Sequence, residues 1–163
     1  MGESGDQRLD RELLGSIIRR YEDVSFRVHR LLSAMLRKSI GEEDITLDQY
    51  LTIRYLRMNG KSTSSELADI FCVGKSSITA IMTRLFDKKL IERIPDAKDR
   101  RVTFLALTDA GLKLAEAIDE RIRERLEAVM KHFGRMEALQ FLETFEKLAN
   151  VLADEEGRSR ETT

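Results

Sequence analysis

The sequence is poor in the residues that build covalent cross-links and metal sites. Its 163 residues include a single cysteine, Cys72, which excludes an internal disulfide. The two histidines, His29 and His132, lie far apart and leave no metal-ligand cluster with a recognisable spacing. No glycine-rich phosphate loop and no nucleophile–base arrangement is present. The sequence therefore predicts no metal, no cofactor and no enzymatic activity.

Long apolar runs are also absent. No run approaches the roughly 20 apolar residues that a membrane-spanning helix needs. The polar N-terminus, residues 1–12, lacks the apolar core of a signal peptide. Hydrophobic residues make up 42% and charged residues 35%, which is typical of a folded, helix-rich chain. We expect a cytoplasmic protein that does not bind a membrane.

A strong excess of charge of one sign is missing, because the net charge is −1. The charge is nevertheless unevenly distributed: residues 61–108 carry +3 and the remainder carries −4. A local excess of this size can arise by chance. Its positions are more informative, because Lys75, Lys98, Arg100 and Arg101 fall at the start of an expected helix and at the tip of an expected hairpin. Basic residues at such positions would meet the phosphates of DNA.

The two ends of the chain have helical periodicity. Residues 9–39 carry apolar residues at spacings of three and four, namely Leu13, Ile17, Tyr21, Val24, Val28, Leu31, Leu32 and Met35. Residues 109–133 and 135–156 have a similar pattern, broken at Gly134. Since these helices are longer than a small domain needs, we assign residues 1–40 and 109–155 to dimerisation. The polar tail, residues 156–163, is expected to be frayed.

Between them, residues 41–108 predict three helices and a hairpin. Thr46 with Gln49, and Thr63 with Glu66, form capping boxes that open two helices, the first of which should be largely enclosed and end at Asn59-Gly60. Residues 72–74 make a turn, and a third helix covers residues 75–89. Its apolar residues Ile78, Ile81, Met82 and Leu85 should face the core. Residues 90–95 and 102–108 predict two strands joined by a charged tip.

The opposite face of the third helix carries the functional hypothesis. It holds the short side chains Ser76, Thr79, Ala80 and Thr83. A helix with such a face could approach the floor of a major groove, with hydroxyls at base edges and methyl groups near thymine. The alternative is an ordinary surface of small residues. Together with the hairpin, the pattern predicts a mainly α fold: a winged helix-turn-helix domain flanked by long N- and C-terminal helices.

One family has this order of motifs. The pattern D-x-R, five residues and Leu-Thr is met by Asp99, Arg101, Leu107 and Thr108, and Gly111 completes a T-x-x-G helix start. Residues 64–93 look like the helix-turn-helix of the same family. Over residues 9–152 the chain resembles the MarR family of bacterial winged-helix transcriptional regulators.

The resemblance implies a homodimer that binds double-stranded DNA. Its first and last helices would pair two copies, the third helix would enter the major groove, and the hairpin would lie along the minor groove. Arg101 would enter the minor groove with Asp99 as its brace, and residues 62–64 would hold a phosphate. The expected DNA-contacting residues are Ser62, Thr63, Ser64, Lys75, Ser76, Ser77, Thr79, Ala80, Thr83, Arg84, Lys98, Asp99, Arg100 and Arg101.

The resemblance also implies a small aromatic or anionic effector. By position we expect Tyr21, His29, Tyr50 and Arg54 to contact it, although core or surface roles are the alternative. Cys72 stands where such a turn usually has glycine. A non-glycine residue with positive φ there would cost about 1–3 kcal/mol. It is either a redox switch or, as we favour, a small residue packed in a turn.

The function predicted is therefore a dimeric repressor of a pseudo-palindromic operator, relieved by an effector. The main alternative is a winged-helix module that docks a protein partner, which the net acidic charge favours and the basic hairpin tip disfavours. A second alternative is a ligand-independent protein that binds DNA without sequence preference.

Overall fold

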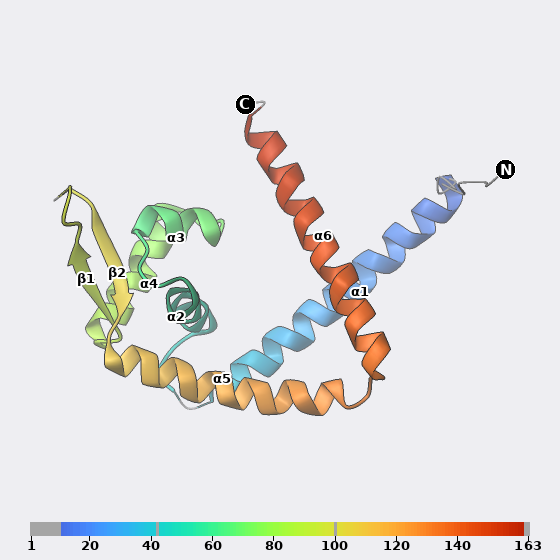
Figure 1. The fold of residues 1–163 in the computed structure, drawn as a ribbon, viewed down its shortest axis with the longest axis horizontal. Coiled ribbons are helices and arrows are strands. Elements are labelled where there is room, and N and C mark those ends of the chain that lie inside the picture. The colour runs from blue at the N-terminus through green and yellow to red at the C-terminus, as the bar shows by residue number, and fades with distance from the viewer. Residues whose placement is uncertain (1–10, 42, 100, 162–163) are drawn as a thin grey trace. The chain divides into compact units, whose positions relative to one another are not determined.

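The computed structural model describes residues 11–41, 43–99 and 101–161, except the side chains of residues 156 and 159–161. The helices are α1 (Arg11–Ile40), α2 (Leu47–Asn59), α3 (Ser64–Ile70), α4 (Lys75–Asp87), α5 (Asp109–Met130) and α6 (Arg135–Glu161). The strands are β1 (Ile91–Pro95) and β2 (Thr103–Leu107), as Figure 1 shows. The chain forms two compact units, Met1–Asp119 and Glu120–Thr163. The predicted order of helices and hairpin is confirmed.

Both predicted capping boxes are present. Thr46 Oγ1 accepts from Gln49 N at 3.3 Å, and Gln49 Oε1 accepts from Thr46 N at 3.2 Å. Thr63 and Glu66 exchange the same pair of bonds at 3.2 and 2.7 Å. Each box satisfies N–H groups that a helix N-terminus would otherwise leave open, which fixes where α2 and α3 begin. Gly60, with φ 80°, ends α2 where the sequence predicted.

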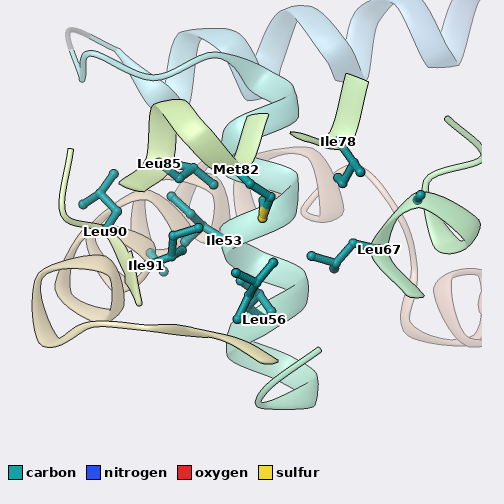
Figure 2. Close-up of a cluster of buried hydrophobic side chains, with 11 residues drawn as sticks. Ile53, Leu56, Leu67, Ile78, Met82, Leu85, Leu90 and Ile91 are labelled. Atoms are coloured by element: carbon teal, nitrogen blue, oxygen red, sulfur yellow. The ribbon is translucent and has the colours of Figure 1, made fainter. Parts of the chain in front are cut away.

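The core of the first unit forms around α2, which packs against α1, α4 and β2, while α4 packs against α3 and β1. Figure 2 shows the buried cluster, which contains Ile53, Leu56, Leu67, Ala68, Ile78, Met82, Leu85, Leu90, Ile91, Leu105 and Ala115. The predicted inward face of α4 is confirmed. The expectation that α2 is largely enclosed is wrong at its C-terminal end, because Met58 is 70% exposed.

The hairpin gains a third, short partner. β1 and β2 pair antiparallel from Ile91 opposite Leu107 to Pro95 opposite Thr103. On the other side of β2, Ser62 forms an isolated bridge with Leu105. The Ser62 N–H donates to Leu105 O at 3.1 Å and the Leu105 N–H donates to Ser62 O at 2.8 Å. The segment before α3 is thereby tied to the hairpin.

The exit from α4 crosses the start of α5 at very close range. Thr108 Oγ1 donates to Lys89 O at 2.7 Å and accepts from Gly111 N at 3.1 Å. The Thr108 N–H donates to Leu90 O at 3.1 Å. A Cβ atom on Gly111 would lie 2.1 Å from Leu90 O. The T-x-x-G motif thus has a physical reason: the threonine ties the two segments together and the glycine lets their backbones approach.

The second unit consists of the end of α5 and the helix α6. α6 reaches Glu161, so the frayed tail expected over residues 156–163 is wrong for residues 156–161. Gly157 alone does not stop the helix, and an ion pair of 2.8 Å between Arg158 Nη1 and Glu155 Oε1 supports its last turns. Among the residues that the structure describes, no helix has the length and apolar character that crossing a bilayer requires.

Two helices expose many large apolar side chains. The α1 stripe consists of Leu13, Leu14, Ile17, Ile18, Tyr21, Val24, Val28, Leu31 and Leu32, each exposed by 39–57%. The α6 stripe consists of Met136, Leu139, Phe141, Leu142, Phe145, Val151 and Leu152. Within it the rings of Phe141 and Phe145 stack with centroids 5.5 Å apart. Apolar surface of this extent is typical of an interface.

Candidate nucleic-acid interface

The outward side of α4 is short and polar, as predicted. Ser76, Thr79, Ala80 and Thr83, which we call the polar face of α4, are all exposed. Thr79 Oγ1 donates to Lys75 O at 2.7 Å and Thr83 Oγ1 donates to Thr79 O at 2.9 Å. These bonds occupy the two hydroxyl protons inside the helix, and each threonine keeps acceptor lone pairs and a methyl group. Such a face suits contact with base edges and thymine methyl groups.

The N-terminus of α4 is open. Gly74 is the N-cap and makes no side-chain capping bond. The N–H groups of Ser77 and Ile78 donate to Gly74 O, whereas no cap serves the N–H groups of Lys75 and Ser76. Together with the helix dipole and the Lys75 ammonium, this end of the helix favours an anion such as a phosphate.

The turn before α4 contains the only cysteine of the chain. Cys72 has φ 50°, a left-handed conformation that costs a non-glycine residue about 1–2 kcal/mol. Its side chain is exposed, and Sγ donates to Asp69 O at 3.6 Å. The expected positive φ is confirmed. The expectation of a packed side chain is wrong, because the sharp turn directs this residue away from the core.

Backbone N–H groups organise the wing tip, residues 96–101. Asp96 Oδ1 accepts from Asp99 N at 2.8 Å and from Lys98 N at 2.6 Å. These bonds hold the pKa of the Asp96 carboxyl below its ordinary value. Asp99 Oδ1 accepts from Arg101 N at 2.9 Å and lies 3.7 Å from Arg101 Nε. The Arg101 side chain is 95% exposed, so its guanidinium projects from a turn whose backbone is fixed.

The other predicted DNA contacts differ in their accessibility. Arg84 and Lys98 are exposed, whereas Arg100 lies outside the described residues. Of the three residues expected to hold a phosphate before α3, Ser64 is exposed and Thr63 is half-buried. Ser62 is only 5% exposed. Burial of the Ser62 side chain, which follows from its pairing with Leu105, disfavours the predicted phosphate contact.

Sequence reasoning missed the residues that hold α4 and the hairpin in place. Lys88, just after α4, forms an ion pair of 2.6 Å with Asp44 Oδ2 and also donates to the Asp44 carbonyl. Lys61 Nζ lies 4.2 Å from the centre of the Phe104 ring of β2. Each contact joins segments far apart in sequence, so no local pattern could have predicted it.

Two of the four predicted effector contacts lie together, because Arg54 is close enough to the Tyr50 hydroxyl to act on its pKa, but Tyr21 and His29 are not brought to them. Tyr21 and His29 are exposed on α1, and no described hydrogen bond or ion pair joins them to Tyr50 or Arg54 of α2. Tyr50 is fully buried, and its hydroxyl donates to Asp119 of α5. Burial, aided by the hydrogen bond and charge of Asp119, raises the pKa of Tyr50 to about 12. Tyr50 is therefore a packed residue with a protein partner, which disfavours a role in contacting an effector.

Comparisons with known proteins agree with this geometry. The family model described as "MarR family" matches residues 45–103, the region from the start of α2 to the start of β2. The chain is 33% identical over 120 residues to the HTH-type transcriptional regulator FarR of Neisseria gonorrhoeae, covering 74% of this chain and 82% of FarR. It is 31% identical over 120 residues to the HTH-type transcriptional repressor MdtR of Bacillus subtilis, covering 73% of this chain and 77% of MdtR. Its fold is similar to that of a mutant MarR from E. coli complexed with operator DNA (TM-score 0.69, 22% identity, covering 80% of this chain and 94% of that chain).

Proposed function

This chain belongs to the MarR family, and from this premise we propose that it is a homodimeric transcriptional regulator that represses by binding a pseudo-palindromic operator in double-stranded DNA. The observation that carries the proposal is the exposed polar face of α4, in a helix whose N-terminus has no side-chain cap and which the wing tip with its exposed arginine follows in the sequence. MdtR is named a repressor, and the E. coli MarR is complexed with operator DNA, which supports the same reading.

In this proposal α4 lies in the major groove. Its 13 residues span about 20 Å, which is enough to follow the groove across several base pairs. Ser76, Ser77, Thr79 and Thr83 read base edges, and the Ala80 methyl group leaves room for close approach. Lys75 and Arg84, near the two ends of α4, contact phosphates. Ser64 and Thr63, at the start of α3, contact the same backbone.

The wing tip contacts the adjacent minor groove. Asp99 fixes the backbone of Arg101, and the exposed guanidinium then enters the groove. A narrow, A·T-rich minor groove carries a strong negative potential that attracts arginine. Lys98 and Arg100 contact the flanking phosphates, which adds affinity that depends on salt but carries no sequence information.

A second copy of the chain covers the apolar stripes of α1 and α6. The α1 stripe consists of Leu, Ile, Val and Tyr side chains and the α6 stripe of Leu, Phe, Met and Val side chains, which remain largely exposed in a single chain. Burial of these side chains against a second copy removes their apolar surface from water. This stabilises the dimer by about 25 cal/mol for each Å² buried. A two-fold dimer places two α4 helices about 34 Å apart and so predicts half-sites one helical turn apart.

A small aromatic or anionic effector is the remaining part of the proposal. Arg54 is half-buried in α2, one turn after Tyr50, and its guanidinium could pair with an anionic effector. Tyr21 and His29 lie on α1, where a second copy would cover them. An effector that binds beside Arg54 should change operator affinity, and Arg54→Ala should abolish the change.

The first test is selection of random-sequence DNA by the purified protein, repeated over a series of salt concentrations. We expect a palindromic motif and a steep salt dependence. Arg101→Ala should then weaken binding to that motif about tenfold. It should also lower the salt slope by up to about 0.9, the value for one counterion released by a bound positive charge.

Arg123→Ala is the matched control, because it removes the same charge from an exposed side chain of α5. It should leave both quantities unchanged. Equal affinity of wild type and Arg101→Ala would contradict the role of the wing. Absence of DNA binding at every salt concentration would contradict the proposed function and favour the docking of a protein partner.

A further inference from the structure

The carboxylate of Asp119, in the middle of α5, is held by two residues of α2. Asp119 Oδ1 accepts from the hydroxyl of Tyr50, and Asp119 Oδ2 lies 2.8 Å from Arg57 Nη2. The side chain of Asp119 is 17% exposed and that of Arg57 is 35% exposed, whereas Tyr50 is fully buried. Both oxygens of one carboxylate are therefore used in a largely water-excluded contact between two helices. Such charge-assisted bonds are strong and directional.

Tyr50 and Arg57 lie seven residues apart, which is two helical turns on the same face of α2. Seven residues rise about 10 Å along a helix. The Asp119 carboxylate therefore joins one point of α5 to two residues of α2. Because it is a single point on α5, it fixes the direction of this helix only together with the contacts that hold the start of the helix.

α5 is also anchored to the first unit near its N-terminus. There the Thr108 hydroxyl and Gly111 hold the start of the helix against Lys89 and Leu90. Beyond this site Ala115 and Ile118 are buried on the same side as Asp119, and Ala115 belongs to the core cluster. Within the first unit, the course of α5 is thus fixed by the crossing at Gly111, the packing of Ala115 and Ile118, and the contacts of Asp119.

α5 is continuous from Asp109 to Met130, so it crosses the boundary between the two compact units after Asp119 without a break. We propose that Asp119 is a positioning residue that sets the spacing between the two α4 helices of the dimer, and hence the half-site spacing that the protein accepts. This inference rests on the proposed function above. Asp119 acts through α2 and α5 and does not itself contact DNA.

The length of the helix indicates how sensitive the spacing is. From Gly111 to Met130 α5 rises about 28 Å, at about 1.5 Å per residue. A rotation of about 10° around the anchored start would move the far end by about 5 Å. This exceeds the rise of one base pair, about 3.4 Å. Loss of the contacts that Asp119 makes with α2 should therefore allow the dimer to bind operators whose half-sites are one base pair closer together or farther apart.

The experiment measures affinity for the selected operator and for operators whose half-sites are moved by one or two base pairs in either direction. Wild type should lose at least tenfold in affinity for each base pair. Asp119→Asn retains the size of the side chain but places an amide where Arg57 needs an acceptor. It should bind the best operator about tenfold more weakly and lose only about twofold to threefold per base pair. A single half-site should be bound equally by both proteins.

Glu120→Gln is the matched control, because it removes one carboxylate charge from the next, exposed residue of α5. It should retain the sharp wild-type preference. Tyr50→Phe removes one of the two contacts and keeps the ion pair of Asp119 with Arg57. Its loss of affinity per base pair should lie between those of wild type and Asp119→Asn. If Asp119→Asn fails to fold, Tyr50→Phe tests the positioning role instead. Circular dichroism identifies that failure.

The outcomes separate the two proposals. An equal loss of affinity at every spacing, or a spacing preference as sharp as that of wild type, would overturn the positioning role while the regulator function stands. If wild type binds no operator at any salt concentration, the proposed function fails first, and the role of Asp119 fails with it.

Discussion

Gly111→Ala should destabilise the protein strongly, although alanine is the better helix former. The added Cβ would lie 2.1 Å from Leu90 O and 3.1 Å from Leu90 C, both of which are backbone atoms. Leu90 is buried, its N–H donates to Leu85 O, and its carbonyl accepts from Thr108 N. Relief of the clash therefore requires the crossing between α4 and α5 to open by about 1 Å.

The free energy has three contributions. Overpacking a tightly packed site costs about 1–3 kcal/mol, and loss of the buried hydrogen bond from Thr108 N costs about 1 kcal/mol more. The higher helix propensity of alanine offsets at most about 1 kcal/mol. We expect the free energy of unfolding to fall by about 1–3 kcal/mol.

Urea unfolding followed by far-UV circular dichroism measures this change. The protein concentration is held fixed, because the proposed dimer would make stability depend on concentration. Gly157→Ala is the control, because Gly157 lies inside α6 and no atom lies within 4 Å of a Cβ built there. It should not lower the free energy of unfolding, since alanine is the better helix former. A Gly111→Ala protein as stable as the control would refute the idea that this glycine permits the crossing.

Two further predictions concern single residues. The unfolded chain releases the Tyr50 proton near pH 10, whereas the folded chain holds it up to a pKa of about 12. The free energy of unfolding should therefore be unaffected below pH 10 and fall above it by about 1 kcal/mol per pH unit, and Tyr50→Phe should remove this part of the fall in alkaline urea titrations. At Cys72, with φ 50°, Cys72→Gly should be about 1 kcal/mol more stable than Cys72→Ala, since both lose the thiol and only glycine accepts this conformation freely. Equal stabilities in thermal unfolding would show that the turn is unstrained.

Local patterns predicted most of the fold. The capping boxes at Thr46 and Thr63 involve residues three positions apart, and the two faces of α4 follow from spacings of three and four. Such relations depend on backbone geometry alone, so the sequence displays them directly. The hairpin was predictable for the same reason, since its strands are separated only by the short wing tip.

Contacts between distant segments were not predictable. Tyr50 meets Asp119 across 69 positions of sequence, and Lys88 meets Asp44 across 44. Without knowledge of how the helices pack, the sequence fits Tyr50 as an effector-contacting residue and as a core residue equally well. Ser62 is similar: its position before a helix suggested a phosphate contact, and only its pairing with Leu105 shows that it is buried.

That pairing of Ser62 has a consequence for how the protein avoids aggregation. A free strand edge recruits other chains through its unpaired N–H and C=O groups. Ser62 occupies the groups of Leu105 on the outer edge of β2, and Pro95 offers no N–H on the edge of β1. Glu92 and Arg93 add exposed charge to that edge. The hairpin can therefore extend into solvent while offering little template for the addition of a strand from another chain.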